Sequence, residues 1–100
     1  MELLQLKYFK DAAELENFSN AAKKNMVPQP SISYAIKKLE EELGVRLFDR
    51  TGRNIILNEN GTYFYKQVST ILNTIDECKI HFSNVTQNEI TIYIQDGDFF

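Results

Sequence analysis

The stretch of residues 18–43, FSNAAKKNMVPQPSISYAIKKLEEEL, constrains the fold of this chain more than any other part of it. Its pattern predicts a short helix at 20–24, a break at 27–28 and a longer helix at 30–43 that ends at Gly44. Two helices joined by a break this short form a helix-turn-helix. We therefore expect the rest of the chain to support this pair of helices.

The longer helix is amphipathic. Four of its apolar residues fall at spacings of four, three and four positions and share one face: Ile32, Ile36, Leu39 and Leu43. The opposite face begins with hydrogen-bonding and cationic side chains, which are Gln29, Ser33, Tyr34 and Lys37. A helix that is buried on one side and polar at its leading end can enter the major groove of DNA. We interpret it as a DNA-reading helix.

The bulk composition favours one small folded domain in the cytoplasm. The chain has 100 residues, of which 43% are hydrophobic, so a small packed core is feasible. No apolar run approaches the roughly 18 residues of a membrane span, and the N-terminus is acidic where a signal peptide would be positively charged. A single cysteine excludes an internal disulfide, and with a single histidine it cannot build a Cys/His zinc site.

The net charge of −3 argues at face value against DNA binding, but the charge is unevenly distributed. Residues 18–53 hold seven Lys and Arg against four acidic residues, whereas residues 59–100 hold two Lys against six acidic residues. Local charge near a contact surface sets the attraction to phosphates more than the total charge does. From charge alone, a solvated surface of mixed charge explains these numbers equally well.

The helices around the break can be predicted in more detail. Residues 3–15 form a first helix with a shared apolar face, which holds Leu3, Leu6, Phe9, Ala12 and Ala13. Ser19 is placed to cap the short helix, because its hydroxyl can accept hydrogen bonds from the amides of the first turn. Met26 and Val27 are expected in the core.

The stretch of residues 45–57, VRLFDRTGRNIIL, predicts a short β-hairpin. Apolar residues lie on either side of a polar turn at 49–54, and Arg50 and Arg53 lie in that turn. A hairpin tipped by arginines directly after a recognition helix is the wing of a winged helix-turn-helix. Such an arginine can reach a narrow minor groove, where the negative potential is enhanced. Alternatively, both arginines are solvated or paired with Asp49.

A long helix follows from residue 59 to about residue 86, and Asn58 is placed to cap it. Its apolar positions alternate in spacings of four and three, which makes a heptad seam: Phe64, Val68, Ile71, Ile75, Cys78, Phe82 and Val85. A helix of ~40 Å is longer than the head can cover, so the seam needs a partner. A second copy of the chain is the simplest one. The alternative, packing on its own domain, suits Phe64 and Val68 only.

Residues 88–100, NEITIYIQDGDFF, change character. Ile90, Ile92 and Ile94 alternate with polar residues, which predicts one strand. One strand is not a domain, so we interpret this segment as the start of a further one.

Taken together, these residues resemble the N-terminal DNA-binding domain of LysR-type bacterial transcriptional regulators. The resemblance is carried by Leu6 and Phe9; by Phe18, Ser19, Ala21 and Ala22; by Gln29-Pro30-Ser31-x-Ser33 and Ile36-x-x-Leu39-Glu40-x-x-Leu43-Gly44; and by Leu47-Phe48-x-Arg50 with Leu57-x-x-x-Gly61. It covers residues 1–61 densely and the long helix more loosely.

The resemblance implies a mainly α fold. A winged helix-turn-helix of three helices and a short β-hairpin wing (residues 1–58) would be followed by a long linker and dimerisation helix (residues 59–87). Residues 88–100 would begin an effector-binding domain that this chain lacks.

The resemblance also implies a function. The chain would be the DNA-binding part of a sequence-specific transcriptional regulator in the bacterial cytoplasm, binding double-stranded promoter DNA as a homodimer. The full-length protein would form a tetramer and sense a small-molecule effector only through the missing domain. No enzyme activity, cofactor or membrane is implied.

The matching positions carry roles over from the family. Base edges in the major groove would meet Gln29, Pro30, Ser33, Tyr34 and Lys37. Backbone phosphates, which position a protein without reading sequence, would be held by Ser19, Ser31 and Lys38. The minor groove would receive Arg53 and Arg50.

Two of the departures from the family's pattern bear on DNA contact. Pro28 stands where the family usually has Ser or Thr, so this side chain cannot provide the cap or the phosphate contact of a hydroxyl. Tyr34 stands where Arg or another long polar residue is frequent. A tyrosine can donate or accept, but it cannot contact guanine through two hydrogen bonds as arginine does.

Other classes of function have less support in the sequence. His81 has no nucleophile or carboxylate cluster nearby, and the four glycines are scattered at element ends rather than gathered in a phosphate-binding loop. A module that only dimerises is a rival, favoured slightly by Pro28 and the net acidity. A winged helix of another regulator family would keep the function and change the dimer geometry.

Overall fold

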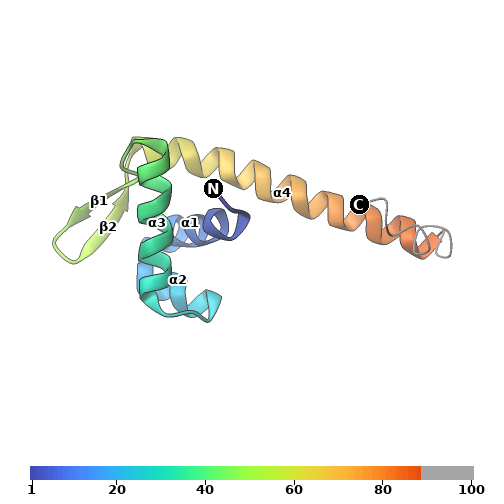
Figure 1. Cartoon of the computed structure of the whole chain (residues 1–100), viewed down its shortest axis with the longest axis horizontal. Helices are drawn as coiled ribbons and strands as arrows, with labels where there is room; N and C mark the ends of the chain where they lie inside the picture. The colour runs from blue at the N-terminus through green and yellow to red at the C-terminus, as the bar shows by residue number, and fades with distance from the viewer. Residues whose placement is uncertain (89–100) are drawn as a thin grey trace. The chain divides into compact units, whose positions relative to one another are not determined.

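The computed structural model describes residues 1–88. Its elements are α1 (Leu3–Leu15), α2 (Phe18–Asn25), α3 (Gln29–Leu43), β1 (Phe48–Thr51), β2 (Asn54–Leu57) and α4 (Glu59–Asn88) (Figure 1). Three helices and an antiparallel hairpin precede one long helix, which confirms the expected fold class. The chain divides into two compact units, Met1–Thr70 and a second that begins at Ile71. The strand expected at 90–94 lies outside the described residues.

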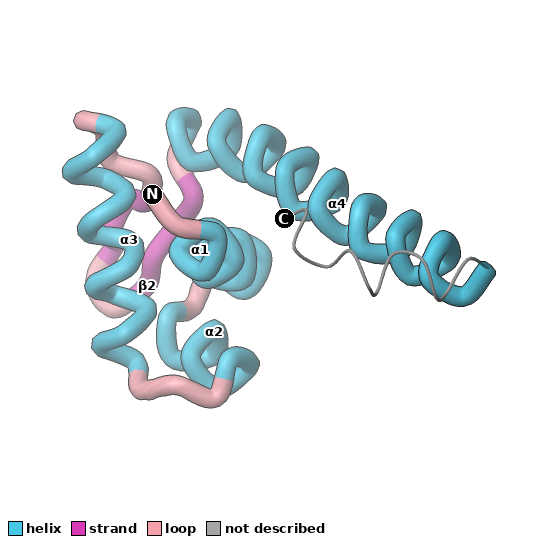
Figure 2. The backbone as a smooth tube through the Cα atoms, turned by 45° about the vertical axis from the view of Figure 1, so that its right-hand side comes forward, coloured by secondary structure: helices cyan, strands magenta, loops and turns pink. Residues whose placement is uncertain are grey.

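The first three helices form the head of the molecule. α2 and α3 are joined by a short loop, and α1 contacts both of them (Figure 2). The expected apolar face of α3 is buried at Ile32, Ile36 and Leu39. Gly44 ends α3 with a φ of 75°, a conformation that glycine adopts without strain. The helix-turn-helix is therefore built as the sequence pattern indicates.

Two predictions about α2 are wrong. Ser19 does not cap this helix, because α2 begins at Phe18 and the side-chain oxygen of Asn17 accepts the Asn20 N–H at 2.8 Å. Met26 is not in the core, since it is 91% exposed. Its backbone takes the left-handed conformation that ends α2, with a φ of 57°, and this turns the side chain to solvent. The position at the helix end, rather than apolar character, decides its exposure.

β1 and β2 form an antiparallel hairpin, called the wing from here on, with Thr51 opposite Asn54. Only Gly52 and Arg53 lie between the strands, so the turn is shorter than the predicted one at 49–54. Gly52 has a φ of 62°, and tight two-residue hairpin turns need such a positive φ. The glycine therefore lets strand pairing continue to the tip of the wing.

Four phenylalanines connect the head, the wing and the start of α4. The buried Phe9 ring lies 5.7 Å from Phe48 and 5.0 Å from Phe64, measured between ring centroids. Phe48 also meets Phe18 edge-on at 5.5 Å. Tilted and edge-on pairs of this kind each add about 0.5–1.5 kcal/mol beyond the burial of their area. The cluster fixes the base of the wing to the helices.

The first turn of α4 clamps the base of the wing. Asn58 Oδ1 accepts the Gly61 N–H at 2.9 Å, which confirms the predicted cap. The side-chain amides of Asn58 and Asn60 both donate to the carbonyl oxygen of Arg46, at 3.0 and 3.3 Å. Glycine is required at Gly61, because a Cβ there would clash with the carbonyl oxygen of Leu47.

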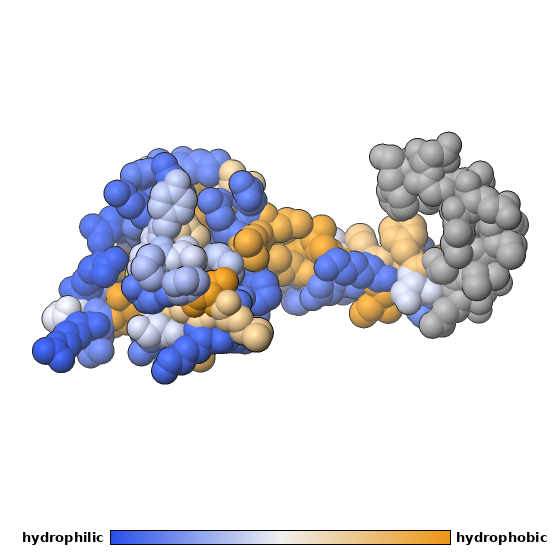
Figure 3. All heavy atoms as spheres, turned by 60° about the horizontal axis from the view of Figure 1, so that its bottom comes forward, coloured by the Kyte–Doolittle hydropathy of each residue, from blue (hydrophilic) through white to orange (hydrophobic). Residues whose placement is uncertain are grey.

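The heptad seam of α4 splits into two parts. Val68 is fully buried in the head, and Phe64 directs its ring at Phe9 of the same chain. Val68 therefore has no exposed surface that could contact a second chain. Its predicted place in the dimer interface is wrong. The remaining seam positions are exposed or half-exposed: Ile71, Ile75, Cys78, Phe82 and Val85. Figure 3 shows apolar surface, in orange, along α4.

A buried charge braces α1 against α2. Asp11 is 3% exposed, and its carboxylate accepts a hydrogen bond from Asn25 Nδ2 at 2.8 Å. It also pairs with Lys24 at 3.1 Å and with Lys7 at 3.2 Å. Burial by itself would raise the pKa of Asp11, but these three donors outweigh it and hold the pKa below its ordinary value of 3.8. The carboxylate is therefore charged and paired at neutral pH.

We expect the stabilisation from Asp11 to vanish in acid. Because the pKa is lowered in the folded state, the contribution is fully present above 3.8 and is lost as the pH falls through the lower pKa of the folded chain. Urea unfolding of the wild-type chain and of Asp11→Asn, from neutral pH to about pH 2, measures it. The difference in unfolding free energy, about 1–3 kcal/mol at neutral pH, should close in acid.

The control is Asp76→Asn, because Asp76 is exposed on α4 and its loss should change stability little at any pH. A difference between wild type and Asp11→Asn that stays constant down to the lowest pH would contradict the role of the charge.

Candidate nucleic-acid interface

The N-terminal end of α3 holds several of the side chains predicted to meet DNA. Gln29 and Pro30 lie in its first turn, and Pro28 precedes them with an extended backbone and no side-chain cap. Gln29 Nε2 donates to Ser33 Oγ at 2.5 Å, one turn along the same face. Pro28, Gln29 and Pro30 are all exposed. This end of α3 is therefore open to a ligand.

Three further predicted residues continue this surface: Tyr34, Lys37 and Lys38. Tyr34 is 61% exposed, and Lys38 Nζ lies 5.4 Å from its ring centroid, within the range of a cation–π contact. Lys38 also pairs with Glu41 at 3.6 Å. Ion pairs between exposed side chains are weak, so this pair leaves Lys38 available to an anion. Ser31 is half-buried in the first turn.

A recess of about 210 Å³ lies where α2, α3 and the wing meet. Four of the predicted site residues line it: Ser19 of α2, Gln29 of α3, and Arg50 and Arg53 of the wing. These residues are far apart in the sequence, so only the fold brings them together. Guanidinium groups, a hydroxyl and an amide in one place have the chemistry that binds phosphate oxygens.

The two arginines of the wing are held differently. The Arg50 guanidinium lies 5.6 Å from the ring centroid of Phe18, the first residue of α2. Arg53 is exposed in the two-residue turn. In the part of the chain that the structure describes, neither arginine forms an ion pair, and Asp49 instead accepts a hydrogen bond from Asn58 Nδ2 at 3.3 Å. The structure therefore excludes the alternative in which Asp49 pairs with the two arginines.

Three polar residues that line the recess are not among the predicted site residues: Glu16, Asn17 and Asn54. Asn17 carries a usable signal, since an asparagine three residues before Asn20 fits the spacing of a helix cap. Asn54 is placed by the register of the hairpin. No local pattern points to Glu16, because its Oε2 accepts the N–H of Leu57, 41 residues away in the chain.

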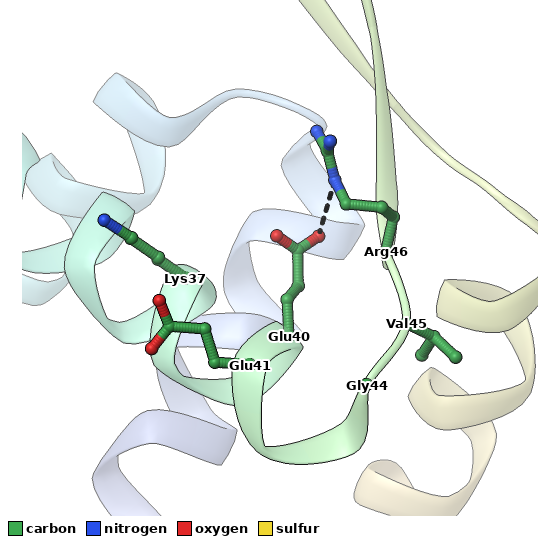
Figure 4. A pocket seen from close by; sticks show the side chains of 6 residues that line it. All are labelled: Lys37, Glu40, Glu41, Gly44, Val45 and Arg46. Carbon is green, nitrogen blue, oxygen red and sulfur yellow. Dashed lines mark ion pairs between the residues drawn. The ribbon is translucent and has the colours of Figure 1, made fainter.

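Lys37 lies outside this recess. It lines a second, open recess of about 440 Å³ at the C-terminal end of α3, together with Glu40, Glu41 and Arg46 (Figure 4). Arg46 Nε pairs with Glu40 at 3.8 Å, and Glu40 Oε2 accepts the Leu47 N–H at 2.8 Å. These contacts tie α3 to the start of the wing. Four of the predicted residues therefore line the first recess, and Lys37 lines the second, farther along α3.

No group of three or more His, Cys, Asp or Glu side chains among residues 1–88 could hold a metal ion. No helix within these residues is long and apolar enough to cross a membrane.

Known proteins are similar to this chain in sequence and in fold. Residues 3–62 match the family model described as bacterial regulatory helix-turn-helix protein, lysR family. The chain is 35% identical over 94 residues to the HTH-type transcriptional regulator BenM of Acinetobacter baylyi, which covers 94% of this chain and 31% of BenM. It is 49% identical over 79 residues to the transcriptional dual regulator GltC of Bacillus subtilis, covering 79% of this chain and 26% of GltC. It thus spans about a third or less of their length.

The fold agrees with a solved structure of one of these relatives. The crystal structure of the BenM DNA-binding domain in complex with catB site 1 DNA matches with a TM-score of 0.82 at 34% identity. The match covers 86% of this chain and 96% of that one. The winged arrangement of helices and hairpin is therefore shared with a domain seen on DNA.

Proposed function

The chain belongs to the LysR family of bacterial regulatory helix-turn-helix proteins, and we propose that it binds promoter DNA sequence-specifically and so regulates transcription. The observation that carries this proposal is the recess, in which Ser19, Gln29 and both arginines of the wing meet. The related BenM domain, with the same fold, is in complex with DNA. A binding role of this kind needs no catalytic group, so the chain would not be an enzyme.

In this proposal α3 reads bases in the major groove. Its exposed N-terminal end offers Gln29, whose amide can contact adenine through two hydrogen bonds. The contact between Gln29 and Ser33 holds the amide in place before DNA arrives, and DNA would replace it. Pro30 would provide apolar contact, for example to a thymine methyl group, and Tyr34 and Lys37 would complete the reading surface.

The other predicted residues would hold the DNA backbone and the minor groove. Ser19, Ser31 and Lys38 would contact phosphates, which position the domain without reading sequence. Arg53, exposed at the tip of the wing, would enter the minor groove. Arg50, held over the ring of Phe18, would stand beside it.

We further propose that two chains pair through α4 (residues 59–87), with residues 1–58 as the DNA-binding domain. The exposed part of the seam would form the interface: Ile71, Ile75, Cys78, Phe82 and Val85. Burying a large apolar side chain is worth about 1.5–3 kcal/mol, so the pairing would be favourable. A two-fold dimer would place its α3 helices on half-sites one or more turns of DNA apart.

Regulation would come from elsewhere in a longer protein. A further domain, beginning at residues 88–100, would sense a small-molecule effector and complete a tetramer. The whole regulator would work in the bacterial cytoplasm, where promoter DNA lies.

The proposed function is tested by titrating the chain with a duplex taken from the DNA upstream of its own gene. We expect binding whose affinity falls steeply with salt, because each phosphate neutralised releases a counterion and contributes about −0.9 to the slope of log K against log salt. Fluorescence anisotropy at several salt concentrations measures this slope. No binding even at low salt would contradict the proposal and favour a module that only dimerises.

Replacing Gln29 by Ala should reduce discrimination between bases. A contact to a base through two hydrogen bonds is worth about 1–3 kcal/mol. Gln29→Ala should therefore weaken binding to the site protected in a footprint of the upstream DNA more than binding to the same site with one base pair changed. Gln67→Ala, a matched change at an exposed position of α4, should leave both affinities unaltered. Equal losses on both duplexes would remove the base-reading role of Gln29.

Replacing Ile75 by Glu should convert the dimer to a monomer, because it places a charge in an apolar interface where it has no partner. Sedimentation velocity measures the outcome. Asn73→Glu adds the same charge at an exposed position outside the seam and should leave the dimer intact. An unchanged sedimentation profile for Ile75→Glu would refute the proposed interface.

A further inference from the structure

Two features make a glutamate at position 16 unfavourable: its backbone conformation and its charge. It ends α1 in the left-handed conformation, with φ 48° and ψ 40°, which glycine adopts freely and other residues adopt under strain. Its side chain also lines the recess that holds Ser19, Arg50 and Arg53. A carboxylate beside a phosphate-binding surface repels the ligand that the surface attracts. A glycine at this position would avoid both costs.

The contact that offsets these costs reaches the wing. Glu16 Oε2 accepts the N–H of Leu57 at 3.1 Å. Leu57 is the last residue of β2 and lies opposite Phe48 in the hairpin. On the other strand, Glu40 Oε2 accepts the N–H of Leu47 at 2.8 Å, just before β1 begins. Carboxylates from two different parts of the head thus hold both ends of the wing where it joins the helices.

We propose that Glu16 is a positioning residue for DNA recognition: its hydrogen bond to Leu57 sets the angle at which the wing leaves the head. This inference rests on the proposed function and adds a residue to it. With the angle fixed, Arg53 is held ready to enter the minor groove before DNA binds. A group that is held in its bound geometry in advance gains affinity and selectivity, because less freedom is lost on binding.

Three variants separate the positioning role from a role of charge alone. Glu16→Gly removes the acceptor and relieves the backbone strain, so the fold should survive. Glu16→Gln removes the charge but keeps an oxygen that can accept the Leu57 N–H. Arg53→Ala shows what complete loss of the minor-groove contact looks like. Thermal unfolding of each variant checks that the head is folded.

The probes are two duplexes that share the sequence protected in a footprint upstream of the gene. One has A/T-rich flanks and the other has G/C-rich flanks where the wing would lie. The readout is the ratio of the two affinities, because a narrow A/T minor groove attracts an inserted arginine. Amide hydrogen exchange at Leu57, measured by NMR on the free chain, is a second readout that requires no DNA.

We expect the wild-type chain and Glu16→Gln to favour the A/T-flanked duplex equally and to protect the Leu57 amide. Glu16→Gly should speed hydrogen exchange at the Leu57 amide. It should also lower the affinity ratio towards that of Arg53→Ala, by about fivefold, which corresponds to the loss of one hydrogen bond. Rescue by glutamine is the result that a merely charged Glu16 would not give, and exposure of the Leu57 amide in Glu16→Gly ties the loss to the hydrogen bond.

The inference would be overturned if Glu16→Gly had the same ratio of affinities for the two duplexes as the wild-type chain, or if the wild-type ratio were one. It would also be overturned if both Glu16 variants bound both duplexes more tightly with unchanged ratios, because Glu16 would then be a simple repulsive charge. A wild-type chain that binds neither duplex contradicts the proposed function instead. In that case exchange at Leu57 still decides whether Glu16 anchors the wing.

Discussion

Phe48 packs against Phe9 of α1 and Phe18 of α2, and the rest of the structure depends on this contact. It is the first residue of β1 and is only 2% exposed, so the base of the wing cannot move without opening the core. Phe9 passes the contact on to Phe64 of α4. Head, wing and long helix therefore share one aromatic cluster. The arginines of the wing therefore depend on this core for their place, and Arg50 also contacts the ring of Phe18.

The acidic residues of the head explain how a chain of net charge −3 can present a basic surface. Several of their carboxylates are occupied with internal donors. Asp11 holds Lys7 and Lys24, Glu14 accepts from Lys10 and from the Tyr65 hydroxyl, and Glu16 and Glu40 accept backbone amides at the base of the wing. The negative charge of the head thus contributes to its architecture, while the arginines of the wing stay free of ion pairs among the described residues.

Much of the fold follows from the sequence because its signals are local. The spacing of Ile32, Ile36 and Leu39 fixes the buried face of α3, and Gly44 fixes its end, since both depend only on helical geometry. Asn58 as a cap follows from the same kind of rule. The family resemblance also names candidate site residues, but it does not group them. That Ser19, Gln29 and Arg53 line one recess depends on how the elements pack.

The errors have a common physical cause. Met26 is apolar, but the backbone at the end of α2 turns it outward. Val68 fits a heptad seam, but it is buried against the head of its own chain. In each case a tertiary contact or a chain reversal outweighs a pattern that is correct for an isolated helix.

The most direct test of a single DNA-facing surface is an NMR titration of the isotope-labelled chain with a duplex from the DNA upstream of its gene. The backbone amides of Ser19, Gln29 and Arg53 should shift together as DNA is added, while those of Asn73 and Asp76 of α4 stay in place. Shifts confined to α4 or to the C-terminal end of α3, with those three amides unmoved, would contradict the proposed surface.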